Sequence, residues 1–378
     1  MTTYNQNDII IQSVLHLAIE LSNSKWKLGF TPSFGQKPRE KSIDAGDFES
    51  LKAEIFKAKE RFNLPSDTPV VSCYEAGRDG FYIHRFLESI GVKNIVIEPA
   101  SIEVNRRAKR AKTDKLDLEK MLTMLIRYQM GEKKVFAVVN VPSVKEEDAR
   151  QMHRDLKTLK NEKTRITNRI KSLFATQGIR KIIINEEFPL FLDEVRLWNG
   201  SLLPEQLKAR LLREFGKWQF IHNQIHDLEE ERKEIIFASN DPAIEKVRKL
   251  LKIKGIGENS ATLFVLEFFG WRNFKNRKEI AALAGLTPTP YQSGDMNKDL
   301  GISKSGNRHI RSMVIDIAWG WIRFQPQSTL TIWFNKRFAT GGKRSRKIGI
   351  VAVARKLLIA LWRYLENGQI PEGAIVEC

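Results

Sequence analysis

Cysteine and long apolar runs are scarce in this sequence, and each absence excludes a class of protein. Only Cys73 and Cys378 occur among its 378 residues, which rules out a disulfide framework or a cysteine-based zinc site. The best apolar run, residues 348–362, is interrupted by Arg355 and Lys356 and is therefore a poor membrane span. The first residues lack the charged and then apolar order of a signal peptide. We therefore expect a soluble, cytoplasmic protein.

Negative charge is also in deficit. The chain has 63 Lys and Arg against 45 Asp and Glu, a formal net charge of +18 and a pI of about 9.8. Such an excess of one sign destabilises a compact chain through self-repulsion unless a polyanion binds it, so nucleic acid is the expected partner. A membrane surface would be the rival partner, but no segment combines a basic face with an anchoring apolar face.

The N-terminal part, residues 1–140, is expected to form an α/β domain. Two apolar-rich runs separated by a turn-like dipeptide predict a hairpin, and later runs alternate between helical and extended spacing. In chain order the expected elements are strands at 13–22 and 25–31, a helix at 48–62, a strand at 68–75, a helix at 80–91, a strand at 93–99 and a helix at 115–128. This order predicts an open sheet covered by helices.

The middle part, residues 141–244, repeats apolar residues at alternating spacings of four and three. The repeat comprises Met152, Leu156, Leu159, Ile166, Ile170 and Leu173, and then Leu207, Leu211, Trp218, Ile221, Ile225, Leu228 and Ile235. Lys163, Glu214 and Arg232 interrupt it. Two such helices predict an antiparallel coiled-coil arm or a dimerisation element. A helical hairpin packed on its own domain is the alternative.

The C-terminal part, residues 245–378, reads as helical, basic and rich in tryptophan. Gly255-Ile256-Gly257 lies between two apolar helical runs and predicts either a helix-hairpin-helix turn for a phosphate or an ordinary corner between helices. Residues 304–311 are expected to cap a helix and present Lys304, Arg308 and Arg311 to phosphates. Residues 341–347 predict a basic loop that either contacts a nucleic-acid backbone or is only solvated. Its cations are Lys343, Arg344 and Arg346.

Four acidic residues are candidate metal ligands. Glu20 and Glu75 end two predicted strands, and Asp114 and Asp117 share one face at the start of a helix. Strand ends of an open α/β sheet face the functional crevice. Converging carboxylates repel one another unless a cation compensates, and Mg²⁺ prefers such oxygen ligands and can hold both sides of a phosphodiester. The preceding cations would hold the nucleic-acid backbone; they are Arg106, Arg107, Lys109, Arg110 and Lys112. The alternative is that the two aspartates only mark a solvated helix start.

These blocks resemble the insertion sequence 110 family of transposases. Residues 18–30, 74–87 and 107–122 resemble its three acidic blocks, and residues 253–294, 301–319 and 347–362 resemble its C-terminal blocks. The resemblance implies a RuvC-like (RNase H-like) domain of the DEDD type, in which these four acids bind Mg²⁺. The family usually has Asp where this chain has Glu20. Glutamate can still bind Mg²⁺, but its extra methylene moves the carboxylate by about 1 Å.

The resemblance also implies a catalytic serine. In this family a serine followed by glycine attacks DNA and becomes covalently joined to it, and the best match here is Ser293. No histidine lies beside Ser293 in the sequence, which favours activation by a metal ion or by the DNA itself. Ser303 and Ser305 are rival positions. Taken alone, Ser293 and Gly294 would be interpreted as a turn.

Together these features predict a DNA recombinase that moves its own insertion element. The resemblance implies donor and target DNA as partners, a noncoding bridge RNA that pairs with both, and a prokaryotic, nucleoid-associated location. It also implies a homodimer or homotetramer, in which acids of one subunit act with Ser293 of another. Two alternatives remain: a hydrolytic RuvC-like nuclease in which water attacks, and a catalytically decayed nucleic-acid-binding protein, suggested by Glu20.

Overall fold

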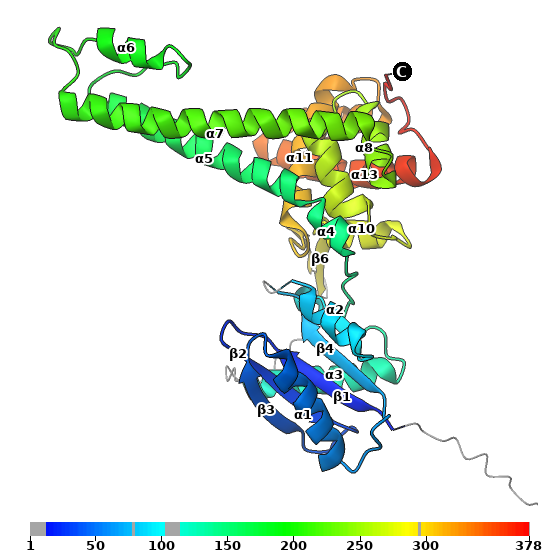
Figure 1. Ribbon diagram of the computed structural model, residues 1–378. Helices are drawn as coiled ribbons and strands as arrows, with labels where there is room; N and C mark the ends of the chain where they lie inside the picture. The colour runs from blue at the N-terminus through cyan, green and yellow to red at the C-terminus, as the bar shows by residue number, and fades with distance from the viewer. Residues whose placement is uncertain (1–12, 78–79, 103–113, 294–295, 378) are drawn as a thin grey trace, which may run out of the picture. The chain divides into compact units, whose positions relative to one another are not determined.

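The chain folds into two compact units. The computed structural model describes residues 13–77, 80–102, 114–293 and 296–377. The first unit spans residues 1–141 and the second spans residues 142–378 (Figure 1). Each unit has its own apolar core, so each is described separately.

The first unit is built on a mixed five-stranded sheet. Its strands are β1 (Leu15–Glu20), β2 (Lys25–Thr31), β3 (Arg39–Asp44), β4 (Val70–Glu75) and β5 (Lys93–Ile97). The spatial order is β3-β2-β1-β4-β5; β1, β2 and β3 pair antiparallel, whereas β1, β4 and β5 pair parallel. The sheet therefore has β1 at its centre, next to β4.

Helices cover both faces of this sheet. They are α1 (Phe48–Arg61), α2 (Tyr82–Ser89) and α3 (Asp114–Gln129), with a short 3₁₀ turn, η1 (Pro99–Ser101). Leu51 of α1 and Ile83 of α2 share one core with Leu17, whereas Leu118 of α3 belongs to a core on the other face with Ala18. An added Cβ at Gly29 would lie 3.2 Å from Leu122 Cδ1, so α3 packs closely on β2. The predicted α/β unit is confirmed.

One strand of this sheet was missing from the prediction. β3 has mostly exposed, charged side chains, and only Ile43 is buried. Charged residues on an edge strand discourage pairing with another chain, but they also remove the apolar alternation by which a strand is recognised. The strand forms because its backbone pairs with β2, and Arg39 makes an ion pair with Glu54 of α1.

The second unit begins with two long helices that pack against each other. Its first helices are α4 (Val144–Asp148), α5 (Gln151–Ala175), α6 (Phe188–Glu194) and α7 (Glu205–Ala238). Contacts of α5 with α7 run from Lys160–Glu229 through Thr167–Trp218 to Arg169–Glu214, so the two helices are antiparallel. Figure 1 shows them side by side, with α6 near the far end. The predicted pair of helices is confirmed, and a coiled-coil geometry stays a prediction.

The predicted apolar stripe describes most of this helix–helix interface. Its central residues are buried, whereas Ile235, at its end, is 38% exposed and was wrongly included. The two residues that interrupt the stripe in α7 are buried as well. Glu214 pairs with Arg169 at 2.7 Å, and Arg232 pairs with Glu258 at 2.9 Å. Buried charge is tolerated here because each group has an opposite partner.

The remaining elements form a mostly helical bundle around a large apolar core. They are α8 (Pro242–Leu251), α9 (Glu258–Phe264), the π-helix η2 (Val265–Phe269), α10 (Arg277–Leu283), strands β6 (Pro288–Ser293) and β7 (Met296–Ile302), α11 (Arg308–Phe324), α12 (Thr329–Phe338) and α13 (Lys343–Asn367). Phe264, Phe268, Trp321 and Leu357 lie in this core. None of the helices in the described ranges is long and apolar enough to cross a lipid bilayer.

The Gly255-Ile256-Gly257 segment forms the turn between α8 and α9. Gly255 has a φ of +90°, and an added Cβ there would lie 3.2 Å from Phe324 Cβ. Ile256 is buried, and Gly257 is the N-cap residue of α9. The predicted turn between two helices is therefore confirmed, and phosphate binding by its backbone stays a prediction.

Candidate functional site

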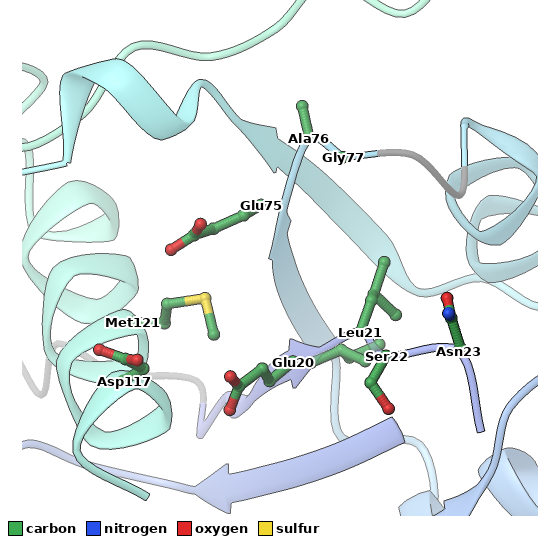
Figure 2. A pocket seen from close by; sticks show the side chains of 10 residues that line it. Glu20, Leu21, Ser22, Asn23, Glu75, Ala76, Gly77, Asp117 and Met121 are labelled. Atoms are coloured by element: carbon green, nitrogen blue, oxygen red, sulfur yellow. The ribbon is translucent and has the colours of Figure 1, made fainter. Parts of the chain in front are cut away.

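Three of the four predicted acids line one cavity in the first unit. Glu20 is the last residue of β1 and Glu75 is the last residue of the parallel neighbour β4. Side chains alternate along a strand, so both lie on the α3 face of the sheet, as Ala18 and Cys73 do. Asp117 reaches the same space from α3. The cavity has a volume of about 450 Å³, and Figure 2 shows the three carboxyl groups around Met121.

The chemistry of this cavity suits a hard cation. Carboxylate oxygens are the ligands that Mg²⁺ prefers. In the ranges that the structure describes, however, no three His, Cys, Asp or Glu side chains form a ready-made metal cluster. Asp114 begins α3, but its side chain lies outside the described part of the structure, as do the cations of residues 106–112. The donor types fit Mg²⁺, and the fourth predicted donor is not among the side chains described.

Asn23 and Cys73 belong to the surroundings of the cavity, and sequence analysis did not assign either to it. Asn23 follows β1 in the turn before β2 and lines the cavity, and its place just after Glu20 was the available signal. Cys73 is fully buried on the α3 face, with its Sγ 3.9 Å from the carbonyl oxygen of Met121. Burial and the negative charge of Glu75 raise the pKa of the Cys73 thiol. The thiol therefore stays protonated and is a packing group.

The three candidate serines lie in different local structures of the second unit. Ser293 ends β6, and its backbone pairs with Met296 of β7. Ser303 and Ser305 lie in the segment between β7 and α11. The Ser303 N–H donates to the Thr287 carbonyl at 2.9 Å, and the Lys304 N–H donates to the Gly285 carbonyl at 3.1 Å. The two rivals therefore sit in a segment held against the chain that leaves α10, whereas Ser293 sits at the end of a hairpin strand.

The predicted cap of α11 is confirmed. Asn307 is its N-cap residue, and its side chain accepts hydrogen bonds from the N–H groups of His309 and Ile310 at 2.9 and 3.1 Å. Lys304 and Arg308 are exposed. Arg311 is only partly exposed and donates to the Ala284 carbonyl at 3.2 Å. Of the three predicted phosphate contacts, Lys304 and Arg308 are thus the more accessible.

The predicted basic loop at residues 341–347 is wrong for most of its length. Helix α13 begins at Lys343, so Lys343, Arg344 and Arg346 are exposed in its first turns. Cations are unfavourable at the positive end of a helix dipole, so these residues do not look like a helix start. The helix forms because later residues, such as Leu357, bury its apolar face.

Sequence analysis missed further cations beside these three. Between Thr329 and Leu365 the chain has nine Lys or Arg and no Asp or Glu, and this asymmetry was the available signal. An added Cβ at Gly349 would clash with the Phe338 ring, so the start of α13 packs directly on the end of α12. Exposed cations of both helices gather there. We call Lys336, Arg337, Lys343, Arg344, Arg346 and Lys347 the α12–α13 basic surface.

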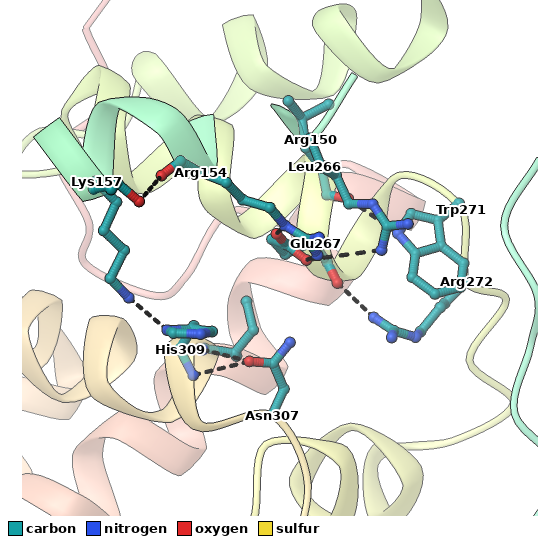
Figure 3. A network of polar contacts seen from close by, with 11 residues as sticks. Arg150, Arg154, Lys157, Leu266, Glu267, Trp271, Arg272, Asn307 and His309 are labelled. Atoms are coloured by element: carbon teal, nitrogen blue, oxygen red, sulfur yellow. Dashed lines mark hydrogen bonds and ion pairs between the residues drawn. The ribbon is translucent and has the colours of Figure 1, made fainter. Parts of the chain in front are cut away.

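A buried carboxylate joins α5 to the C-terminal helices. Glu267, in the π-helix, accepts two hydrogen bonds from Arg154, at 2.7 and 3.0 Å, and lies 3.9 Å from Arg150 (Figure 3). Burial alone would raise the pKa of Glu267, but the hydrogen bonds and charge of Arg154, together with Arg150, outweigh it and hold the pKa below its usual value. The carboxylate therefore stays ionised and anchors the start of α5.

The buried imidazole of His153, next to this network, is expected to make the stability of the fold sensitive to acid. Burial is the main cause that lowers the pKa of His153 to about 4, from 6.5 in an unfolded chain, and nearby Lys157 and Arg154 add to it while Glu267 opposes it. A lowered histidine pKa means that the unfolded state takes up the proton first. We expect the contribution of His153 to be complete above pH 6.5 and to fall by at most about 3 kcal/mol as the pH drops to 4.

Urea denaturation at a series of pH values measures this loss. His153→Gln cannot titrate, so its free energy of unfolding should fall less than that of the wild type between these pH values. His226→Gln is the control, because His226 is exposed and should leave the wild-type slope unchanged. Equal slopes for His153→Gln and the wild type would contradict the assignment.

Comparisons with known proteins agree with one another. A family model described as the transposase IS116/IS110/IS902 family matches residues 247–331, a range that includes β6, β7 and Ser293. The protein y4rJ of Sinorhizobium fredii, named as a transposase, is 38% identical over 375 residues, covering 96% of this chain and 94% of that protein. The transposase for insertion sequence element IS1328 of Yersinia enterocolitica is 24% identical over 313 residues, covering 81% of this chain and 87% of that protein.

Proposed function

Because the chain belongs to the IS116/IS110/IS902 family of transposases, whose general activity is DNA cleavage and strand transfer in transposition, we propose that it cuts and rejoins DNA through a covalent serine–DNA link. The observation that carries metal-dependent cleavage is the meeting of Glu20, Glu75 and Asp117 at one cavity, and the serine link rests on the position of Ser293 before glycine within the matched residues 247–331. The sheet order and the positions of these acids on β1, β4 and α3 support a RuvC-like assignment.

Glu20, Glu75 and Asp117 would hold Mg²⁺, with Asp114 as the predicted fourth ligand. The bound ion would neutralise charge that develops on a reacting phosphodiester. Glu20, in place of the usual Asp, still lines the cavity with the other two acids, which supports an active rather than a decayed site. The cavity therefore supplies the acidic half of the proposed reaction.

Ser293 would supply the nucleophile. Its Oγ would form a bond to phosphorus while the bond from phosphorus to a sugar oxygen breaks, and the Oγ proton would end on the departing sugar oxygen. This step conserves the energy of the phosphodiester in the serine–DNA link. A sugar hydroxyl of another DNA end can then attack the link and release Ser293. Cutting and rejoining thus need no further energy source.

Nucleic acid would be held by the α12–α13 basic surface together with Lys304 and Arg308. These exposed cations would contact backbone phosphates, which fits recognition of shape rather than of base sequence. A noncoding bridge RNA that pairs with donor and target DNA remains part of the proposal and rests on the family alone, because a net charge of +18 suits RNA and DNA equally. Cutting two duplexes needs several active sites, so we propose self-association through the α5–α7 arm as a dimer or tetramer. Exposed Phe220 and Leu212 on α7 support that role.

Metal removal tests the proposed function. The full-length protein is incubated with RNA from the noncoding flank of its gene and with a DNA duplex that carries the ends of its element. With Mg²⁺ we expect a protein–DNA adduct that survives denaturing electrophoresis and disappears after protease treatment, and no adduct with EDTA. Cut DNA without an adduct would instead identify a hydrolytic nuclease. Binding without cutting would identify a nucleic-acid-binding protein.

A further inference from the structure

Lys157 of α5 lies against His309 of α11, so this lysine has an imidazole as its partner instead of a carboxylate. The Lys157 ammonium is within hydrogen-bonding distance of the Nδ1 atom of His309 (Figure 3). Within the described ranges the structure pairs Lys157 with this imidazole and with no carboxylate. The nearby acid, Glu267, is already occupied by the two hydrogen bonds from Arg154. Lys157 therefore keeps an uncompensated positive charge.

Burial, together with the positive charge nearby, favours the neutral form of the His309 imidazole. Burial and the positive charge of Lys157 lower the pKa of His309, and Arg154 and Arg308 act in the same direction. Glu267 opposes them, but more weakly than Lys157. A neutral imidazole can accept the hydrogen bond from Lys157, whereas a protonated one would repel it.

Backbone N–H groups at the start of α11 are already used and are not the groups that would bind an anion here. The N–H groups of His309 and Ile310, in the first turn of α11, already donate to the Asn307 side chain. The exposed groups are the side chains of Lys157, His309 and Arg308. An anion arriving here would therefore be bound by side chains from two elements.

We propose that Lys157 and His309 form a proton-linked binding site for a phosphate of a nucleic-acid backbone, with Arg308 at its edge. The inference rests on the proposed nucleic-acid-binding function and extends the contact surface to the start of the α5–α7 arm. A phosphate between the two groups accepts hydrogen bonds from both and offsets their mutual repulsion. Both can then carry positive charge at once, which the free protein disfavours.

The linkage has a definite sign. Bound phosphate raises the pKa of His309 above its lowered value in the free protein, so binding takes up a proton between these two pKa values. Affinity therefore rises as the pH falls toward and through the bound-state pKa, by at most about tenfold per pH unit for one proton. His153, whose pKa is about 4, stays neutral between pH 8 and pH 6 and does not contribute.

The chain contains a matched control pair. Lys163, also on α5, lies 2.8 Å from the Nδ1 atom of His222 on α7. There the Trp218 ring lies 4.7 Å below the Lys163 ammonium and stacks on His222 at 5.0 Å. Burial lowers the pKa of Lys163, but the face of the aromatic ring and the charge of Glu229 favour its ammonium form, so the second pair does not need an anion.

Fluorescence anisotropy with a labelled DNA duplex and a labelled RNA hairpin tests the proposal. Between about pH 8 and about pH 6 we expect wild-type affinity to increase about 3- to 10-fold beyond the increase of His309→Gln. Lys157→Gln should reduce the salt dependence of binding by about one phosphate contact. His222→Gln and Lys163→Gln should behave as the wild type does, and circular dichroism checks that all variants fold.

The possible outcomes distinguish failure of the Lys157–His309 site from failure of the proposed nucleic-acid-binding function. An effect with one probe only assigns the phosphate to DNA or to RNA, and an effect with both indicates contact with either backbone; each supports the site. Wild-type pH and salt dependence in both His309→Gln and Lys157→Gln would overturn it while leaving the proposed function intact. Loss of binding by the wild type itself would overturn the proposed function and this site with it.

Discussion

Replacing Ser293 with alanine is expected to remove the covalent protein–DNA adduct and to lower strand transfer by at least about 10³-fold. The substitution deletes the oxygen that would attack phosphorus, and the cavity acids alone cannot form a stable bond to DNA. Ser293 ends β6, where its backbone pairs with Met296, and alanine keeps that pairing. The loss should therefore appear in denaturing gels of adduct, with unchanged thermal unfolding and DNA affinity.

Ser303→Ala and Ser305→Ala are the matched controls for this experiment. Both serines lie within the same unit and close in sequence, but in the segment that packs against the chain leaving α10. We expect adduct formation by both variants to stay within about threefold of the wild type. An adduct in Ser293→Ala that disappears in either control would move the nucleophile to that serine.

Removing the charge of Asp117 or Glu75 is expected to lower DNA cleavage by at least about 10²-fold. Asp117→Asn and Glu75→Gln keep the size and shape of the side chain, so cavity packing is preserved. Each substitution removes one of three carboxylates that meet at the cavity, which weakens Mg²⁺ binding. Cleavage is measured across a Mg²⁺ titration, because a lost ligand raises the concentration required for half-maximal rate.

Protein stability distinguishes a metal-binding role from a structural one. A residue whose role is to bind metal contributes little to the metal-free fold, so Asp117→Asn should leave the free energy of unfolding without Mg²⁺ unchanged. A structural role would instead lower it. Glu49→Gln is the control, since Glu49 is exposed on α1, pairs with Lys52 and lies away from the cavity. Full cleavage by Asp117→Asn would exclude Asp117 as a ligand.

Glu20→Asp completes this series. If the longer side chain has weakened the site, Glu20→Asp should cleave faster than the wild type. If the wild type does not cleave DNA and Glu20→Asp does, the protein is a catalytically decayed copy. Equal or lower activity of Glu20→Asp would indicate that the site functions at least as well with glutamate at position 20 as with aspartate.

The first unit was largely predictable because its signals are local. The apolar runs that locate β1 and β4 end at Glu20 and Glu75, so the sequence already places both residues at strand ends. Alternation along each strand then decides which face of the sheet each carboxylate lies on. The same reasoning failed for β3, whose charged residues carry no apolar alternation. It failed again at the start of α13, where Lys343 and Arg344 resemble a loop. In both cases long-range contacts override the local pattern.

The sequence by itself determined the family, the order of the acidic residues, the position of Ser293 before glycine, the excess positive charge and the apolar faces of α5 and α7. These depend on composition or on neighbours within a few residues. Only the tertiary structure decided that Glu20, Glu75 and Asp117 share a cavity and that Glu214 is buried beside Arg169. It also decided that Lys157 meets His309 rather than an acid. Each of these depends on how segments distant in the chain pack, and no local pattern carries that information.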